Sequence, residues 1–463
     1  MRRRRDEGVV RPRGNAVPQG RAAVLDWLGG RVDFERTPPK KPGADFGLGR
    51  MRRLLARLDA PHDAFPVVHV AGTKGKGSTV AMLSAVLSAA GHRTGRYMSP
   101  HVHALEERIS IDGRPISAAA LVAVFDILIP TVEALDRAAA RRGGRGPTWF
   151  EVVTAAAFLH FARSRVDLAV LETGLGGRLD ATNVSRPVVS VITSVSLDHM
   201  ELLGRTVGRI AGEKAGIIKR GRPVISGAAH PAARRVIADT ARRRRAALLQ
   251  VGRDFRVTHA ASDDPLEGGA VEVTSVRDGV SEHFRLAMAG RHQADNAALV
   301  VMAARQVDAA GFAVPRQAIA RGLARVRLPA RIECVEVAPH VGVDAAHNVA
   351  SMRSLLETLA PALATRRPRV LVFAASMDKQ IEEMLAAATG CFDHVILTRY
   401  TTNTRAAPVA RLVSACRAAG LPPPRVAGTP VEALEAARGV AGRGGMVCVA
   451  GSFFLASEIL RPA

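Results

Sequence analysis

The sequence predicts an α/β fold built from two parallel-sheet domains. Short apolar runs, such as residues 166–171, alternate with longer helical segments, and this alternation is typical of parallel strands joined by helices. The alternation occurs twice, once from Phe65 to Ile225 and again from Val341 to Val449. The chain of 463 residues is also longer than one ordinary core, because single domains rarely exceed about 250 residues.

The elements of the first domain follow from apolar runs that end in glycine or polar residues. A strand over residues 65–70 precedes a helix over 78–90, which Gly91 closes, since glycine commonly follows the last residue of a helix. Further buried strands are expected at 166–171, 188–192 and 223–225.

The second domain is predicted from four apolar strands separated by Ala-rich helices. The strands are expected at 341–343, 369–373, 394–397 and 446–449. The first residues, rich in Arg, Gly and Pro, have no apolar periodicity and are expected to be disordered. The predicted organisation is an Arg-rich tail over 1–21, a first domain over 22–327, and a smaller Rossmann-like α/β domain over 328–463.

The composition favours a cytoplasmic protein that does not enter a membrane. Hydrophobic residues make up 48% of the chain, yet no apolar run approaches the roughly 18 charge-free residues that a membrane span needs. The N-terminal residues 1–7 do not continue into the apolar stretch of a secretory signal. The four cysteines lack Cys-x-x-Cys spacing, so neither a zinc site nor a disulfide framework is predicted.

The charge balance is strongly basic, with a formal net charge of +23. A basic chain can bind nucleic acid. However, the arginines are spread over the whole sequence, and aromatic residues that could stack on bases make up only 4%. We therefore interpret most of this charge as solvated surface that favours acidic ligands, and we expect no nucleic-acid partner.

A glycine-rich turn links the first predicted strand to the helix that follows it. The turn runs Gly72-Thr73-Lys74-Gly75-Lys76-Gly77-Ser78. Its glycines let backbone N–H groups face an anion, while Lys76 and the Ser78 hydroxyl can reach phosphate and Mg²⁺. Only two residues separate Gly72 from the Gly75-Lys76 pair, whereas the common P-loop has about four. A plain strand–helix connection is the alternative, but the pattern favours a P-loop parallel-sheet ATPase domain.

Polar residues that follow the predicted strands are further candidates, because ligands of parallel sheets bind beyond the carboxyl ends of the strands. Glu172 follows one strand and could hold a metal or cap a helix. His199 follows another and could be a ligand or an ordinary polar residue, since Mg²⁺ prefers oxygen. Lys214 lies in an apolar helical stretch, where an ion pair is the simplest interpretation.

Three later positions suit a nucleotide. Asn296 lies where a helix opens, and its amide could bond a base, although Asp295 or Asn296 could equally cap that helix. Arg331 suits a phosphate bidentately, and Asp344, which follows a strand, suits ribose hydroxyls.

Taken together, these segments resemble the folylpolyglutamate synthase and dihydrofolate synthase family of the Mur ligase superfamily, over nearly the whole chain after Ala22. The run at 174–183 and the triplet Ser99-Pro100-His101 distinguish this branch from the cell-wall Mur ligases. The other marks are the phosphate loop, Glu107-Arg108-Ile109, Leu197-Asp198-His199, residues 213–217, His292-Gln293 with Asn296, residues 344–348, and Gly451-Ser452-Phe453.

The resemblance implies an ATP-dependent amide ligase that adds L-glutamate to a folate, and also to dihydropteroate, through an acyl phosphate. It would use ATP and Mg²⁺, its second domain would close over ATP and bind glutamate, and it would act as a monomer. Whether one or both substrates are used stays open. Two other functions also stay open: a Mur-type ligase for a cell-wall precursor, and a basic nucleotide-dependent nucleic-acid-binding protein.

The resemblance also implies roles for individual residues. ATP would be bound by Thr73, Lys74, Gly75, Lys76, Gly77, Ser78, Asn296, Arg331, Asp344 and His347. Mg²⁺ would be held by Ser78, Ser99, Glu172 and His199. The catalytic residues would be Lys76, His199 and an N-carbamylated Lys214. Folate would be bound by Ala44, Asp45, Phe46, Thr148, Trp149, Phe150, Glu151, Leu179, Asp180 and Ala181.

Three positions depart from the family pattern. Lys74 stands where Asn is common, and its added charge could tighten phosphate binding or point outward. Ala330 and Ala345 each replace a glycine, so the backbone there lacks the conformational freedom that glycine gives.

Overall fold

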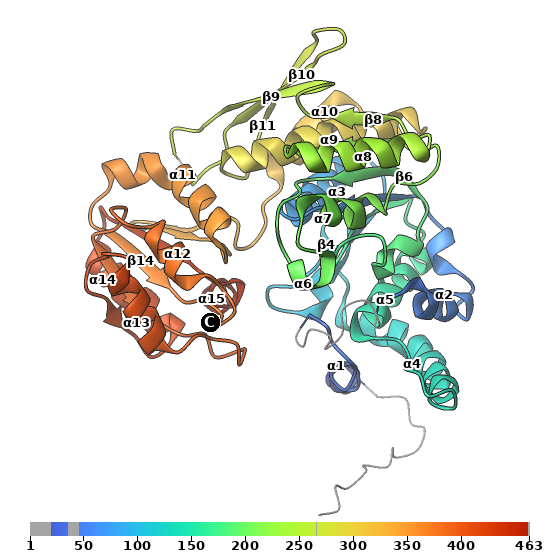
Figure 1. Cartoon of the computed structure of the whole chain (residues 1–463), viewed down its shortest axis with the longest axis horizontal. Coiled ribbons are helices and arrows are strands. Elements are labelled where there is room, and N and C mark those ends of the chain that lie inside the picture. Colours follow the sequence, from blue (N-terminus) through green and yellow to red (C-terminus); the bar gives the residue numbers. More distant parts are fainter. Residues whose placement is uncertain (1–19, 36–45, 265, 462–463) are drawn as a thin grey trace, which may run out of the picture.

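The computed structural model describes residues 20–35, 46–264 and 266–461. Most of the predicted tail lies outside these residues, and its last residue, Arg21, begins the first helix, α1 (Arg21–Gly29). Two sheets, each covered by helices on both faces, make up the two halves of the molecule (Figure 1). The predicted α/β fold is confirmed.

The larger sheet has the strand order β4-β3-β2-β5-β1-β6-β7-β8. The six strands from β2 to β8 in this order run parallel, and β3 pairs antiparallel with both β2 and the edge strand β4. The central strand β1 pairs with β5 on one side and β6 on the other, so the carboxyl ends of these three strands are neighbours. The bounds are β1 Val67–Ala71, β2 Thr94–Tyr97, β3 Ile109–Ile111, β4 Arg114–Pro115, β5 Leu168–Glu172, β6 Pro187–Ile192, β7 Val224–Ser226 and β8 Leu248–Gln250.

The strands of this sheet are buried on both faces, as parallel strands usually are. In β5, Ala169 and Leu171 pack into a core with helices α4 and α5, whereas Leu168 and Val170 pack into a core with α3, α9 and α10. The helices of this half are α2 (Leu48–Ala56), α3 (Lys76–Ala89), α4 (Ala118–Ala140), α5 (Trp149–Arg163), α6 (Met200–Leu203), α7 (Val207–Ala215), α8 (Pro231–Arg243), α9 (Arg291–Ala309) and α10 (Arg316–Arg325).

Helix α4 is the only helix in the described part of the chain that is long and apolar enough to cross a membrane. It carries Asp126 and Glu133, and it packs against α1, α2 and α5. Its side chains Leu121, Phe125 and Leu128 are buried in the core that α4 shares with these helices. The apolar character of α4 therefore serves the packing of this half of the molecule.

A three-stranded antiparallel sheet, which the sequence analysis did not predict, follows β8. It has the order β11-β10-β9 and packs on α9 through buried side chains such as Phe255, Val271 and Phe284. Figure 1 shows it projecting beyond α9. Its strands are β9 (Phe255–Ala260), β10 (Ala270–Ser275) and β11 (Ser281–Arg285).

The second sheet has the order β12-β13-β17-β14-β15-β16, and only the edge strand β12 runs antiparallel. Helices α11, α12 and α13 cover one face, and α14 and α15 cover the other. The strands are β12 (Glu333–Val337), β13 (His340–Val343), β14 (Arg369–Phe373), β15 (His394–Leu397), β16 (Arg425–Val426) and β17 (Met446–Ala450). The helices are α11 (Val349–Thr365), α12 (Ile381–Ala386), α13 (Val409–Ala418), α14 (Pro430–Ala441) and α15 (Phe453–Ile459).

Candidate active site

The phosphate loop connects β1 to α3, and two of its glycines are required by close neighbours. Gly75 has a φ of 82°, which favours glycine, and a Cβ there would lie 2.2 Å from Oδ1 of Asn296. A Cβ on Gly72 would lie 1.8 Å from Oγ1 of Thr193. The loop is therefore packed tightly between the end of β6 and the second turn of α9, which carries Asn296.

Residues that follow β6 hold the backbone of this loop. The Thr73 amide donates to the Ser194 carbonyl at 2.7 Å, and the Lys74 amide donates to the Ser194 hydroxyl at 3.0 Å. The Thr193 hydroxyl donates to the Lys74 carbonyl at 2.6 Å. Thr193 and Ser194 are not among the predicted site residues, although their position directly after a strand is a signal that could identify them.

Two lysines donate to one carbonyl oxygen beneath the loop. Nζ of Lys76 lies 3.2 Å from the Gly72 oxygen, and Nζ of Lys214 lies 2.8 Å from it. Lys214 is buried in α7, and burial together with the charge of Lys76 lowers its pKa to about 7. Among the described residues no carboxylate directly contacts Lys214, although the charge of Asp198 opposes the lowering of its pKa.

Glu172 is the last residue of β5 and lies beside the loop. Its side chain is buried, and burial raises its pKa to about 7 although the Lys76 charge opposes this shift. Oε2 of Glu172 accepts from the Ser99 amide at 3.2 Å and lies 3.6 Å from where a Cβ on Gly77 would be. Ser99, Glu172 and the first turn of α3, which includes Ser78, therefore come together.

These donors fit a hard divalent cation. Among the described residues, no side chain forms an ion pair with the desolvated Glu172 carboxylate, although the Lys76 charge acts on it. The hydroxyls of Ser78 and Ser99 add the oxygen ligands that Mg²⁺ prefers. The described residues contain no cluster of three or more His, Cys, Asp or Glu side chains that could hold a metal. His199 is exposed before α6, and no contact among the described residues joins it to Glu172.

The predicted nucleotide residues of the second half lie where its chain begins. The Asp344 carboxylate accepts from the amides of Ile332 (2.9 Å) and Ala346 (2.7 Å). Desolvation raises the pKa of Asp344, and the charge of Arg331 opposes this shift. Ala330 has a φ of 56°, the left-handed conformation that favours glycine, whereas Ala345 does not. Of the two alanines that replace a glycine, only Ala330 therefore adopts a conformation that favours glycine.

Asn296 is held by its own helix. Its Nδ2 donates to Oε1 of Gln293 at 3.1 Å, and both side chains are buried. The N-cap residue of α9 is Gly290, so neither Asp295 nor Asn296 caps this helix. Nδ1 of His347 lies 2.9 Å from the Ala345 carbonyl, which keeps the ring close to Asp344, and desolvation lowers the pKa of His347.

Among the predicted folate residues, Phe150 contacts the loop after β5, and Leu179, Asp180 and Ala181 lie at the end of that loop. Phe150 packs on Gly174, where a Cβ would lie 2.5 Å from its ring, and Trp149 lies under the Arg108 guanidinium at 4.6 Å. Phe46 packs on the Phe34 ring at 5.4 Å. Ala44 and Asp45 lie outside the described residues, Thr148 caps α5, and half-buried Leu179 and buried Ala181 flank Asp180.

Two of these residues have structural partners. Oε2 of Glu151 accepts from the Thr148 amide at 2.7 Å and from Nε of Arg50 at 2.9 Å. The Asp180 carboxylate accepts from the Leu175 amide at 3.0 Å and from the Thr182 amide at 3.0 Å. Both carboxylates therefore hold the loops that carry the aromatic and small residues.

Arg108, which the sequence indicates only as part of a motif, contacts three residues of this region. Its guanidinium is buried, donates to both carboxylate oxygens of Glu35 at 3.0 and 2.7 Å, and donates through Nε to Nδ1 of His101 at 2.8 Å. Arg108 thus links the Ser-Pro-His segment to Trp149.

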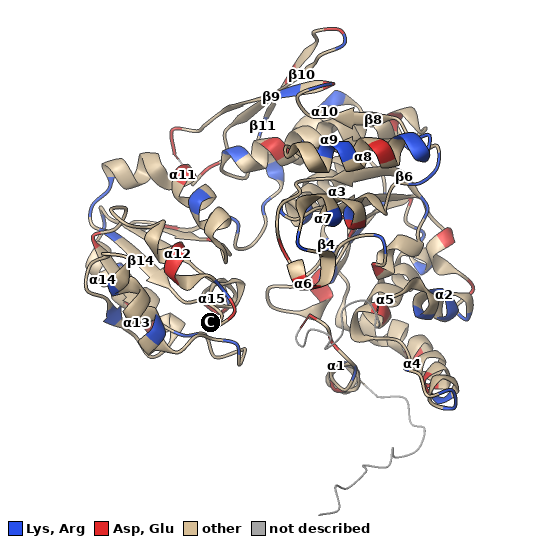
Figure 2. Ribbon diagram, in the orientation of Figure 1, with Lys and Arg blue, Asp and Glu red and all other residues tan. Residues whose placement is uncertain are grey.

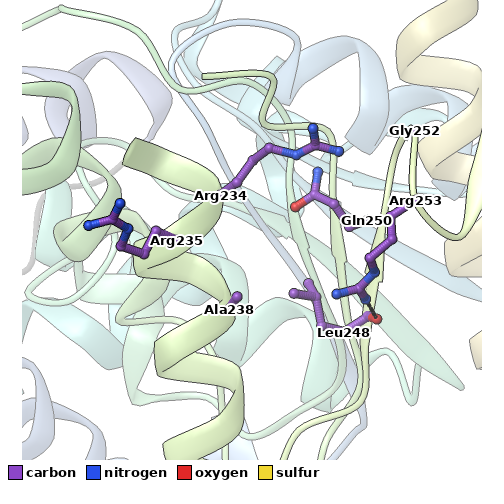
Figure 3. A pocket seen from close by; sticks show the side chains of 7 residues that line it. All are labelled: Arg234, Arg235, Ala238, Leu248, Gln250, Gly252 and Arg253. Carbon is purple, nitrogen blue, oxygen red and sulfur yellow. Dashed lines mark hydrogen bonds between the residues drawn. The ribbon is translucent and has the colours of Figure 1, made fainter. Parts of the chain in front are cut away.

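A separate cavity of about 440 Å³ lies between α8 and β8 (Figure 3). Arg234 and Arg253 at its wall donate to the backbone carbonyls of Val251 and Leu248. Strands β6 and β7 separate it from β1. The cavity is therefore not part of the site at the phosphate loop.

Comparison with known proteins identifies two family domains. Residues 131–304 match the Mur ligase middle domain, and residues 330–453 match the Mur ligase glutamate ligase domain. The chain is 40% identical over 365 residues to the dihydrofolate synthase/folylpolyglutamate synthase of Bacillus subtilis, which covers 78% of this chain and 80% of that one.

Solved structures agree with these matches over almost the full length. Mycobacterium tuberculosis folylpolyglutamate synthase complexed with ADP superposes with a TM-score of 0.81 at 34% identity, covering 95% of this chain and 97% of that one. Escherichia coli FolC in complex with DHPP and ADP gives a TM-score of 0.79 at 30% identity, covering 94% and 96%. The matched domains, the identity and the shared fold together show that this chain belongs to the dihydrofolate synthase/folylpolyglutamate synthase family.

Proposed function

We propose that this protein is an ATP-dependent ligase that joins L-glutamate to a folate carboxylate. The observation that carries the proposal is the convergence of Lys76, Lys214 and Glu172 at the carboxyl ends of three adjacent strands, close to the Phe150 ring at Gly174. Relatives named for this activity, and related structures with bound ADP, support it.

The chemistry needs an activated carboxylate, because a carboxylate does not react with an amine in water. The folate carboxylate oxygen attacks the γ-phosphorus of ATP, which releases ADP and leaves an acyl phosphate. The glutamate amine then attacks the acyl carbon, phosphate leaves, and the amine proton is lost. Lys76 stabilises the charge that develops on the transferred phosphoryl group.

Mg²⁺ would neutralise phosphate charge when bound, and we assign Ser78, Ser99 and Glu172 to hold it, with His199 as a further ligand. For ATP we propose the loop residues 73–78 together with Asn296, Arg331, Asp344 and His347. Trp149 and Phe150 offer ring surface for the pterin, since both are only half-buried. The second domain, over residues 328–463, would bind glutamate and exclude water from the acyl phosphate.

We also propose that Lys214 is carbamylated. Its amine is buried and has a pKa of about 7, so a large neutral fraction exists near neutral pH. A neutral amine can add to CO₂ and lose one proton, which gives a carbamate. This change would place an anion instead of a second cation beside Lys76, where a metal-supporting carboxylate is useful.

The proposed function is tested by ATP turnover with glutamate and one further substrate. ADP release should depend on glutamate together with a reduced folate, with dihydropteroate, or with each of them. The assay also decides whether the enzyme has one or both activities. Turnover only with a cell-wall precursor or with a polynucleotide would overturn the proposal. The polynucleotide is included because basic side chains occur on helices of both halves, including α2, α8 and α13 (Figure 2).

We further infer that the protein is cytoplasmic and acts as a monomer.

Replacing Lys76 with Met should lower turnover by at least about a hundredfold, because a charge-stabilising donor to the phosphoryl group is lost. Steady-state rates at saturating substrates measure the effect. Lys76→Arg, which keeps the charge, is the matched control and should retain more activity than Lys76→Met. Near-normal turnover of Lys76→Met would contradict the assignment.

Replacing Glu172 with Gln should stabilise the metal-free protein while lowering its activity. The Glu172 pKa rises from 4.5 to about 7 on folding, so the cost of burying its charge grows between these pH values and is complete above the upper one. Urea unfolding with a chelator should show a gain of about 3 kcal/mol above pH 7 and little gain below pH 4.5. The exposed Glu435→Gln should change stability by less than about 0.5 kcal/mol at either pH. A gain that is larger at low pH would contradict the burial argument.

Carbamylation of Lys214 predicts a mass increase equal to one CO₂ on the native protein, measured at mildly basic pH, that disappears in Lys214→Ala. Short carboxylic acids should partly restore the activity of Lys214→Ala, because they can supply the missing carboxylate. Lys219, which donates to Asn183 at 2.8 Å, should stay unmodified. A free Lys214 amine in active enzyme, with no rescue of the variant, would count against the proposal.

A further inference from the structure

Lys74 of the phosphate loop contacts the other half of the molecule. Its Nζ donates to Oδ1 of Asn348 at 2.9 Å, a contact between residues 274 positions apart in the chain. The Lys74 backbone is fixed at both its amide and its carbonyl by Ser194 and Thr193. The side chain therefore extends from a rigid base toward the second half.

The acceptor in this contact is also fixed. Asn348 is the N-cap of α11, and its Oδ1 accepts from the Ser351 amide at 2.9 Å and from the Ser351 hydroxyl at 3.0 Å. One amide oxygen thus serves both the helix cap and the lysine. Partial burial lowers the pKa of Lys74, and the charge of Asp198 opposes this shift.

Helix α11 meets the first half at a second point. The Ser354 hydroxyl lies 3.1 Å from Nδ1 of His292 in α9, and Thr358 lies against Gly290 at the start of the same helix. The first turns of α11 therefore rest on both the phosphate loop and α9. Among these contacts, only the hydrogen bond from Lys74 has a charged donor. Hydrogen bonds with a charged donor are stronger than those between neutral groups.

We propose that Lys74 is a positioning residue that fastens the phosphate loop to the N-terminus of α11 and so holds the second half of the molecule against the nucleotide site. The 2.9 Å contact with Asn348 directs the lysine toward the second half, so its side chain does not simply point outward. His347 directly precedes Asn348 in the chain, so this contact lies beside the residues predicted to bind the nucleotide. The catalytic consequence rests on the proposed function, since glutamate would bind in the second half.

Hydrogen exchange of the nucleotide-free protein tests the contact without any activity. In Lys74→Met, amides of residues 349–356 should exchange about tenfold faster than in the wild type, the scale expected when a charged hydrogen bond is lost. Asn348→Ser, which can still cap α11 but is too short to reach Lys74, should have a similar effect. The double variant should add little to either single change, and Asn348→Asp, which keeps both contacts, should exchange as slowly as the wild type.

Lys219→Met is the matched control, because this lysine also bonds an asparagine side chain, but within the first half. It should leave exchange at 349–356 unchanged. In the glutamate assay, Lys74→Met should raise both KM values unequally. The fold increase in the KM for glutamate should be about ten times the fold increase in the KM for ATP. Unchanged exchange in Lys74→Met, or additive effects in the double variant, would overturn the proposal. A wild type without ligase activity would overturn the proposed function instead, and the exchange result would still decide the role of Lys74.

Discussion

The pairing of β1 with both β5 and β6 is the constraint on which the site depends. The register sets Val70 opposite Glu172 and Ala71 opposite Ile192, so the phosphate loop leaves the sheet between a carboxylate on one side and Thr193-Ser194 on the other. Shifting the register between β1 and β5 by one residue would turn the Glu172 side chain to the other face of the sheet. The position of the charged groups is thus a property of the sheet and not only of the loop.

The same pairing concentrates charge in a poorly solvated place. Lys76 and Lys214 share the Gly72 carbonyl, and Glu172 is buried beside them with a pKa raised to about 7. Burying these charged groups without a ligand lowers the free energy of unfolding. Ligands of complementary charge offset this cost when they bind. Such a site is expected to gain stability when a nucleotide and a cation bind.

Much of the fold and part of the site could be predicted from the sequence, because apolar runs and glycine positions are local signals. The strands ending in Glu172 and preceding His199 were found in this way, and the resemblance then supplied roles. The sheet β9–β11 was missed because its strands are half exposed and lack a continuous apolar run. The partners of Lys214 and Glu151, and the contact between Lys74 and Asn348, could not be predicted because they join residues far apart in the chain.

The backbone around Arg331 has a consequence for how variants of Asp344 behave. Ala330 and Ile332 on either side have φ values of 56° and 51°, and this conformation is costly for alanine and more so for a β-branched residue. One oxygen of Asp344 holds the Ile332 amide in this conformation, and the other holds the Ala346 amide. Loss of the Asp344 carboxylate would therefore let the connection between the halves relax and turn Arg331 away. A weakened nucleotide affinity in such a variant would report the relaxed connection as well as a missing ribose contact.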